Sequence, residues 1–364
     1  MKTTAVTLLR LSRVINMNWW KRLSINPLAR IGAIFIGILY GLTIFAGFIT
    51  PYSMYDAPKN SALLPPTQIY WHNQQGEYIG AHVYPTTQGA VDFETGDRKL
   101  IVDFSKPSRI LIFHYGHLFS TTGEGRLNLL GTDDQGRDQF TRLLYGGRVS
   151  LFIGIIGTSI SFAVGCLVGG ISGYFGGLLD SFLMRLVEVI MSVPSIYLLV
   201  ALAAILDKNP FTQLPFTNAE RFILITVIIS FVQWAGLARI IRNQVLSIKE
   251  EQFVTAAIAT GADSLRIITR HILPQTSSFI VISATLAIPS FIVSESVLSL
   301  IGLGIQPPDP SWGNMLSLAT NASVIILQPW LIWSPAVLII LTVLSFNLLG
   351  DGLRDALDPK NLKG

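Results

Sequence analysis

Residues 149–170 read VSLFIGIIGTSISFAVGCLVGG and contain no charged side chain. A helix needs about 20 predominantly apolar residues to cross the hydrocarbon core of a bilayer, so this stretch predicts a membrane-spanning helix. Five further charge-free stretches of similar length occur along the chain. They are residues 31–50, 189–206, 222–238 and 272–294, and a last one near 329–349 inside the uncharged stretch 310–350. We therefore expect six transmembrane helices.

The composition agrees with this count. Only 13% of the 364 residues are charged and 50% are hydrophobic, and the mean hydropathy is +0.52, whereas a soluble domain carries about 25% charged residues. These values exclude a cytosolic enzyme, a disordered protein and a secreted disulfide scaffold. The single cysteine, Cys166, also excludes a multi-cysteine metal site. The sequence predicts an all-α polytopic membrane protein in the lipid bilayer, whose net charge of +4 reflects topology rather than a nucleic-acid partner.

Lysine and arginine in short loops orient such a protein, because they remain in the cytoplasm. The first thirty residues hold six basic residues and no acidic one. Both termini and the loop after the fourth stretch are therefore predicted to be cytoplasmic. The basic residues on this side are Lys2, Arg10, Arg13, Lys21, Arg22, Arg30, Arg239, Arg242, Lys249, Arg266, Arg270, Arg354, Lys360 and Lys363; the opposite short loops hold Lys208 and Arg221. The first apolar stretch is longer than the 7–15 residues of a signal peptide, so we expect it to remain in the chain.

The sequence thus divides into five parts. A basic cytoplasmic segment (1–30) precedes the first span (31–50). A small extracytoplasmic insertion (51–147), with strand-like residues at 100–104 and 110–113, predicts a β-containing region. A transmembrane core (148–350) contains the cytoplasmic loop 239–275, and a cytoplasmic tail (351–364) follows. Four histidines of the insertion raise the question of a metal site, but without cysteine or a spaced carboxylate we expect ordinary polar surface; they are His72, His82, His114 and His117.

Small residues recur at every fourth position of the second span and its exit. They are Gly157, Ser161, Gly165, Gly169, Gly173 and Gly177. Such a stripe lets a neighbouring helix backbone approach closely. We expect it to serve tight packing; sliding along the stripe during a conformational cycle is the alternative.

Glu295, between Ser294 and Ser296, interrupts an otherwise apolar fifth span. A carboxylate at this depth is either a contact of the transport pathway or a buried structural group, and we favour the structural role. With so little charge in its spans, the chain has few groups for coupling to an ion gradient. The energy for transport would come from elsewhere, or the protein would be a passive pore.

The cytoplasmic loop predicts two short helices. The first covers residues 250–260, with Gly261 at its C′ position, and Asp263 or Ser264 would cap the second, which Pro274 would end near Leu273. On the second helix Leu265, Ile268 and Ile272 fall on one face, and Arg266 and Arg270 on another. An isolated helix of this length is marginal in water. Its apolar face therefore predicts a docking groove on a protein partner, the alternative being the lipid surface.

Several motifs resemble those of bacterial ABC importer permeases. Thr255-Ala256-Ala257, Gly261 and Leu273-Pro274 resemble the EAA loop of that family. The following stretches, in this order, resemble signatures of the C-type subunit in dipeptide, oligopeptide and nickel permeases: LGTDDQGRD (130–138), TRLLYGGRVS (141–150), GYFGG (173–177), SVPS (192–195), PPDPSWG (307–313) and LGDGLRDALDP (349–359).

This resemblance implies an importer that moves short peptides or a related solute into the cytoplasm by alternating access. In such importers a second permease completes a heterodimer in the bacterial inner membrane. Two ATPase subunits use ATP and Mg, and an extracytoplasmic binding protein delivers the solute. The resemblance implies that the residues coupling this chain to an ATPase are Phe253, Thr255, Ala256, Ala257, Gly261, Leu265, Arg266, Ile268 and Pro274, with Leu265, Arg266 and Ile268 as contacts.

The chain departs from the family pattern in two places. Thr255 stands where the motif usually has glutamate, and residues 52–124 form a longer insertion than is usual, suited to contact the binding protein or to pack on the partner permease. A phosphate-binding loop of the form GxxxxGK[ST] is absent from the sequence. We therefore expect no catalytic residue, metal or cofactor in this chain. The alternatives are a stand-alone channel or ion-coupled carrier, for which Glu295 is the supporting residue, and a membrane scaffold.

Overall fold

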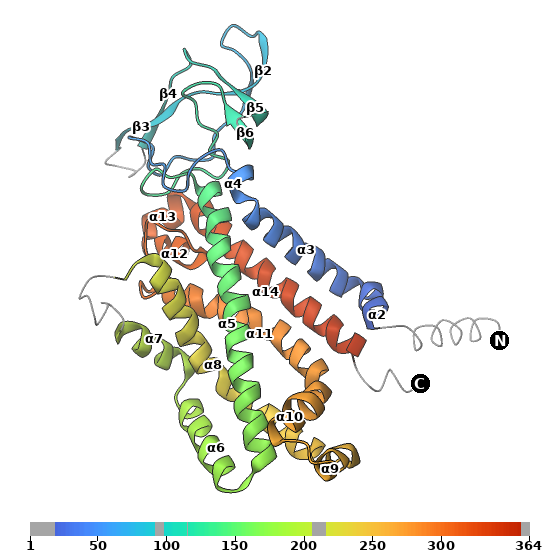
Figure 1. Ribbon diagram of the computed structural model, residues 1–364. Coiled ribbons are helices and arrows are strands. Elements are labelled where there is room, and N and C mark those ends of the chain that lie inside the picture. Colours follow the sequence, from blue (N-terminus) through green and yellow to red (C-terminus); the bar gives the residue numbers. More distant parts are fainter. Residues whose placement is uncertain (1–18, 92–97, 115, 206–215, 358–364) are drawn as a thin grey trace, which may run out of the picture.

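The computed structural model describes residues 19–91, 98–114, 116–205 and 216–357. A bundle of long helices carries a small β region at one end (Figure 1). Predictions for the basic residues 1–18, for Lys208, for the end of the third span and for the tail 358–364 lie outside the described residues. The two ends of the bundle are called here the β end and, opposite it, the loop end.

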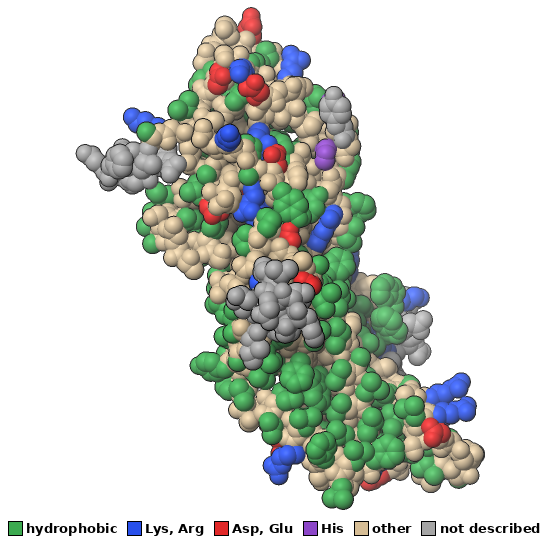
Figure 2. Space-filling model, turned by 60° about the vertical axis from the view of Figure 1, so that its left-hand side comes forward, with side chains coloured by type: hydrophobic (Ala, Val, Ile, Leu, Met, Phe, Trp, Pro, Cys, Tyr) green, Lys and Arg blue, Asp and Glu red, His purple; other side chains and the backbone are tan. Residues whose placement is uncertain are grey.

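Five single helices of the described chain are long and apolar enough to cross a membrane. They are α3 (Pro27–Ile44), α5 (Gln139–Phe175), α8 (Asn218–Ile248), α11 (Ser277–Leu300) and α14 (Pro329–Leu357). Side chains cap the starts of three of them: Asn26 caps α3, Asp138 caps α5, and Thr217 forms a capping box with Glu220 at the start of α8. Figure 2 shows the hydrophobic belt of this bundle between charged residues at both ends. The expected mostly helical membrane fold is confirmed.

The third expected span differs from a single helix. The chain forms α6 (Gly177–Ser192) and α7 (Ser195–Ile205), which bend by 87° at a short break and count as a sixth span only if taken together. Pro194 explains the break, because its ring disfavours helical geometry at the preceding residue, and Val193 is extended (φ −94°, ψ 128°). The prediction of one continuous helix over 189–206 was therefore wrong.

The described residues of the insertion form six short strands. Antiparallel neighbours follow the order β1-β2-β5-β6 in one sheet, and β3 pairs with β4 in a second. The strands are β1 (Tyr70–His72), β2 (Tyr78–Val83), β3 (Thr86–Val91), β4 (Arg98–Val102), β5 (Ser108–His114) and β6 (His117–Thr121). The strand-like residues near 100–104 and 110–113 thus fall on β4 and β5, so the predicted β content is confirmed.

One histidine of the insertion contradicts the expectation of polar surface. His82 is fully buried, its Nδ1 lies 2.7 Å from the Gly80 carbonyl oxygen, and its Nε2 lies 3.1 Å from the Tyr84 hydroxyl. Its ring packs against the rings of Tyr70 and Tyr84, whose centroids lie 6.1 and 5.0 Å away. Within the described residues, no cluster of three or more His, Cys, Asp or Glu side chains is arranged to hold a metal ion.

The small-residue stripe of α5 packs against α8. A Cβ atom on Gly173 would lie 2.7 Å from the Arg242 carbonyl oxygen, and one on Gly165 would lie 2.9 Å from Leu237. Glycine is therefore needed for the observed approach of the two backbones. Tight packing is confirmed, sliding stays untested, and Gly177 lies outside the stripe, where it begins α6 at φ +60°.

Short helical segments complete the chain. The short helix α4 (Ala46–Ile49) lies at the β end. At the loop end, α2 (Trp19–Ile25) packs beside the end of α14. Directly after α2, the Asn26 Nδ2 donates to the Asp355 carboxylate over 3.5 Å. The segments of the connecting loops are α9 (Gln252–Ala259), α10 (Ser264–Ile267), a π-helical turn (Ile268–Ile272), a 3-10 turn (Leu273–Thr276), α12 (Trp312–Leu316), a second 3-10 turn (Ser317–Thr320) and α13 (Ala322–Leu327).

The predicted stop at Pro274 was wrong. The chain continues through the 3-10 turn directly into α11. Proline is tolerated there because it occupies the first turn of a new helical segment, where its missing N–H has no partner to lose.

Candidate functional site

The first candidate site is the segment from α9 to the 3-10 turn, residues 252–276, called here the α9–α10 segment. Its corner is fixed by backbone hydrogen bonds. Gly261 has φ +81°, its N–H donates to the Ile258 carbonyl over 2.9 Å, and the Ala262 N–H donates to the Ala257 carbonyl over 3.1 Å. This is the Schellman arrangement, which favours glycine at the left-handed position. Asp263 then caps α10 by accepting from the Leu265 N–H, as expected.

The inner face of the segment is buried against the membrane core. Val254, Ile267 and Ile272 pack in one cluster with Leu237, Ile241 and Val245 of α8. Ile268 adds a contact with α5, because a Cβ placed on Gly170 would lie 3.2 Å from its Cγ2. The segment is therefore held against both α5 and α8.

The outer face carries most of the residues that the sequence assigns to coupling. Leu265 is 59% exposed and Phe253 is 39% exposed. Thr255, Ala256, Gly261, Arg266 and Pro274 are also exposed, and Ala257 is half-buried. These residues form a surface that a partner can reach.

Ile268 departs from this expectation, since only 2% of it is exposed. The sequence placed it on one helical face with Leu265, but the chain from residue 268 follows a wider π-helical turn. Ile267, Ile268 and Ile272 face the core, whereas Leu265 stays outside. Its assignment as a contact residue was therefore wrong for this structure.

An ion pair missed by the sequence analysis joins α6 to α8. The Arg242 Nε donates to the Asp180 carboxylate over 2.7 Å, and Ser172 donates to the same carboxylate. Lys249 adds a bond of 3.3 Å to the Gly173 carbonyl oxygen. Asp180 and Arg242 lie 62 residues apart in the sequence, so spacing gave no signal for the pair.

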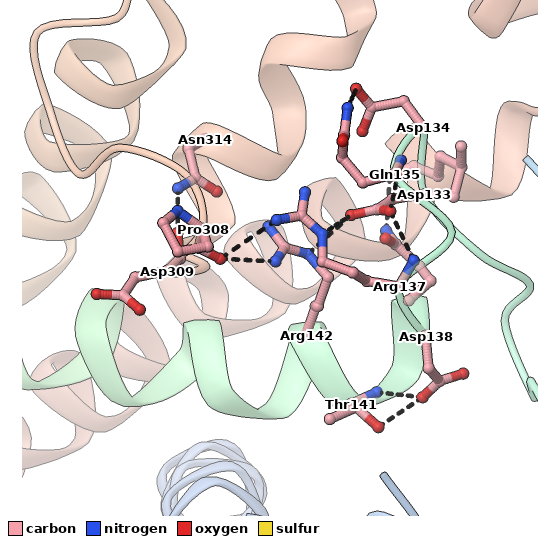
Figure 3. Close-up of polar contacts among 12 residues, drawn as sticks. Asp133, Asp134, Gln135, Arg137, Asp138, Thr141, Arg142, Pro308, Asp309 and Asn314 are labelled. Carbon is pink, nitrogen blue, oxygen red and sulfur yellow. Dashed lines mark hydrogen bonds and ion pairs between the residues drawn. The ribbon is translucent and has the colours of Figure 1, made fainter. Parts of the chain in front are cut away.

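The second candidate site is a polar junction at the β end, formed by Asp133, Arg137, Arg142 and Pro308 (Figure 3). The Asp133 carboxylate lies 2.8 Å from the Arg137 Nε and 3.1 Å from the Arg142 Nε, and all three side chains are at least 90% buried. Arg142 also donates to the Pro308 carbonyl oxygen over 2.9 Å. The junction thus ties the start of α5 to the loop before α12.

Two sequence signatures meet at this junction, although their quoted motifs lie far apart in the chain. The Trp312 backbone N–H donates to the Ser150 hydroxyl over 3.1 Å, and the Trp312 indole N–H donates to the Leu143 carbonyl oxygen over 2.9 Å. The motifs alone could not place them together. The signal available in the sequence was that both hold charged residues beside apolar spans.

Asp138, next to the junction, caps α5 by accepting from the N–H and the hydroxyl of Thr141. Burial raises the pKa of its carboxyl to about 6, although the two Thr141 bonds oppose that rise. A cavity of about 360 Å³ lies at the junction itself, between the α5 start and the loop 307–318, and Asp133, Arg137, Arg142 and Asn314 are among its lining residues.

Glu295 is fully buried between α11 and α5. Its carboxylate accepts from the Ser150 hydroxyl over 3.1 Å and from the Ser299 hydroxyl over 2.7 Å. Ser299 in turn accepts from the Ile305 N–H over 3.1 Å. These bonds join α5, α11 and the loop after α11, which favours a structural role for Glu295. Contact of Glu295 with a solute stays a prediction.

Comparison with known proteins identifies the family of this chain. Residues 165–363 match the family model described as binding-protein-dependent transport system inner membrane component. The chain belongs to this family. Residues 17–66 of this permease match the model for the N-terminal transmembrane domain of oligopeptide transport permease C, so the resemblance to C-type ABC permeases is confirmed.

Relatives extend the match along the permease. The oligopeptide transport system permease protein OppC of Haemophilus influenzae is 42% identical over 64% of this chain and 71% of its own length. The dipeptide transport system permease protein DppC of Bacillus subtilis is 33% identical over 94% of this chain and 84% of its own length. Among solved structures, an inward-facing MetNI methionine ABC transporter aligns with a TM-score of 0.46 at 20% identity, over 60% of this chain and 97% of that one.

Proposed function

We propose that this permease is one of two membrane subunits of an ATP-driven importer that moves short peptides into the cytoplasm. A second permease would complete the pathway, two ATPase subunits would supply the energy, and an extracytoplasmic binding protein would deliver the peptide. The names of the OppC and DppC relatives, which are peptide transport permeases, support this substrate class. ATP and Mg would bind the ATPase subunits rather than this chain.

The observation that carries the proposal is the two-sided build of the α9–α10 segment. Its inner face is packed against α5 and α8, whereas Leu265, Phe253 and Ile258 expose apolar surface on its outer side. Exposed apolar side chains on a well-anchored surface segment are typical of a protein docking site. A displacement applied to this segment would be transmitted to the spans, because the buried inner face leaves little freedom for it to move alone.

The proposed orientation places the loop end in the cytoplasm of a bacterial cell and the β end outside its inner membrane. The basic residues of the 239–271 loop support this orientation. The described ends of α2 and α14 lie together at the loop end, so both termini would face the cytoplasm (Figure 1).

Transport would follow alternating access. ATP binding would bring the ATPases together and move the docked α9–α10 segments, so that the spans reorient toward the binding protein. Hydrolysis would then return them. The ATPases drive this change only to the extent that they bind the two states of the permease with different affinity.

The proposal is tested with the complete complex reconstituted in proteoliposomes with its binding protein. The assay measures ATP-dependent uptake of a mixture of di-, tri- and tetraalanine. Leu265→Asp should lower uptake by about tenfold or more and release the ATPase subunits, because it places a charge in an apolar contact. Leu265→Met is the matched control and should keep both.

Two outcomes contradict the proposal. One is uptake and ATPase association that L265D leaves unchanged at normal membrane levels. The other is uptake by this chain in the absence of the ATPase subunits, which would favour the stand-alone channel or carrier.

A further inference from the structure

Two neutral polar side chains meet at the surface of the membrane core, in the middle of two spans. The Gln233 Nε2 donates to the Ser290 Oγ over 3.4 Å, and Ser290 is exposed. Gln233 is the central residue of α8, fifteen residues from each end, and Ser290 lies thirteen residues after the start of α11. At 1.5 Å per residue, Gln233 is about 22 Å from either end of its helix. The pair therefore lies near the midplane of the membrane.

This position is unfavourable if lipid covers it. A primary amide offers two N–H donors and a carbonyl acceptor, and the bond to Ser290 uses a single donor. The Ser290 hydroxyl donates to the Ala287 carbonyl oxygen of its own helix. The remaining amide groups need water or another polar partner, because hydrocarbon offers none.

The apolar faces of other spans give a contrast. The central turns of α3 expose Ile34, Phe35 and Ile38, and those of α14 expose Ile340 and Leu344. Such surfaces suit acyl chains. The α8–α11 face is different, since it carries the polar pair, and a Cβ placed on Gly236, one turn from Gln233, would meet nothing within 4 Å. The exposed Val293 lies one turn from Ser290.

The helices that carry the pair are also those joined by the α9–α10 segment. That segment begins four residues after α8 ends at Ile248, and it leads directly into α11 at Ser277. A displacement of the segment would therefore act on both helices. Their long polar bond is the kind of contact that such a movement can open or close.

We propose that the α8–α11 face around Gln233 and Ser290 lines the solute pathway at the membrane midplane and binds the main chain of the transported peptide. This inference rests on the proposed function. An amide and a hydroxyl together supply a donor and an acceptor for peptide N–H and C=O groups. Because both groups are uncharged, they would recognise the main-chain amide that all peptides share, while Gly236 and Val293 leave apolar space for varied side chains.

The test uses the complete complex in membrane vesicles, with Cys166→Ala as the background. Single variants Gln233→Cys and Ser290→Cys are treated on both membrane faces with a membrane-impermeant cationic methanethiosulfonate, which reacts only with water-exposed thiolates. Ile34→Cys on α3 is the matched lipid-facing control. We expect modification at 233 and 290 and none at 34, with the peptide mixture slowing modification by about tenfold at saturation.

Three results would overturn the inference. The first is that neither cysteine is modified in the nucleotide-free complex or in the ATP–vanadate-trapped complex, which is expected if the partner permease covers the face. The second is equal modification of the cysteine at position 34. The third is modification at 233 and 290 that the peptides do not slow. Uptake by the Cys166→Ala complex separates this from the proposed function. If that complex takes up none of the peptides, the proposed function fails, whereas normal uptake with unmodified cysteines contradicts the pathway assignment alone.

Discussion

The α9–α10 segment and the polar junction lie at opposite ends of the long helices, and they use different kinds of side chain. The segment keeps apolar residues on both faces, one set buried in the core and Leu265 outside. The junction instead encloses a carboxylate and two guanidinium groups within the chain. The difference teaches that the junction finds its hydrogen-bond partners within the chain, whereas the outer face of the segment keeps apolar side chains exposed.

The largest expected effect comes from breaking the junction. Asp133→Asn would leave Arg137 and Arg142 buried without their carboxylate, so we expect the free energy of unfolding to fall by about 3–5 kcal/mol. The thermal midpoint in detergent measures this. Glu188→Gln, which breaks an exposed pair with Arg185, is the control and should change stability by less than about 1 kcal/mol. Equal midpoints for the two variants would show that the junction does not stabilise the β end.

The next effect separates the two faces of the segment. Ile268→Ala should lower the free energy of unfolding by about 2–5 kcal/mol because it creates a cavity in the core. Leu265→Ala, on the exposed face, should change it by less than about 0.5 kcal/mol yet weaken ATPase association. Thermal unfolding and co-purification of the ATPase subunits measure the two properties. If both variants lowered stability equally, the distinction between inner and outer faces would be lost.

The smallest effect concerns pH at the β end. The folded pKa of Asp138, about 6, lies above its unfolded value, so the folded state binds the extra proton between these values. Asp138 therefore favours folding at low pH, and its contribution falls as pH rises from about 4 to about 6, by about 1–3 kcal/mol. Asp138→Asn keeps a capping side chain but removes the titration. The free energy of unfolding, measured against pH from about 4 to about 6, should therefore have a different slope in the native protein and in Asp138→Asn. Parallel curves would contradict the raised pKa of Asp138.

Local features of this protein were predictable from its sequence. Charge-free stretches located the spans, because crossing a bilayer sets a minimum apolar length. Gly261 and Asp263 were predicted at a helix end and a helix start, and both lie there, since caps depend on a few adjacent residues. The coupling surface around Leu265 was proposed from its motif, and its exposure agrees with that proposal.

Other features depended on which distant parts of the chain meet. Ile268 is buried although Leu265 is exposed, the rings of Tyr70 and Tyr84 pack against the buried His82, and the chain bends near Pro194 in a stretch whose composition predicted one helix. The bond of Gln233 to Ser290 could not be seen in the sequence, because each lies alone in an apolar run.

The sequence by itself determined that this chain spans a membrane, where its five long apolar helices lie and which segments carry family motifs, since these follow from local hydrophobicity and spacing. Only the tertiary structure decided that Asp133, Arg142 and Pro308 form one junction and that Leu265 and Ile268 face opposite ways. The physical reason is that packing brings together residues far apart in the chain, and the side chain that is buried or exposed is settled only when its neighbours are in place.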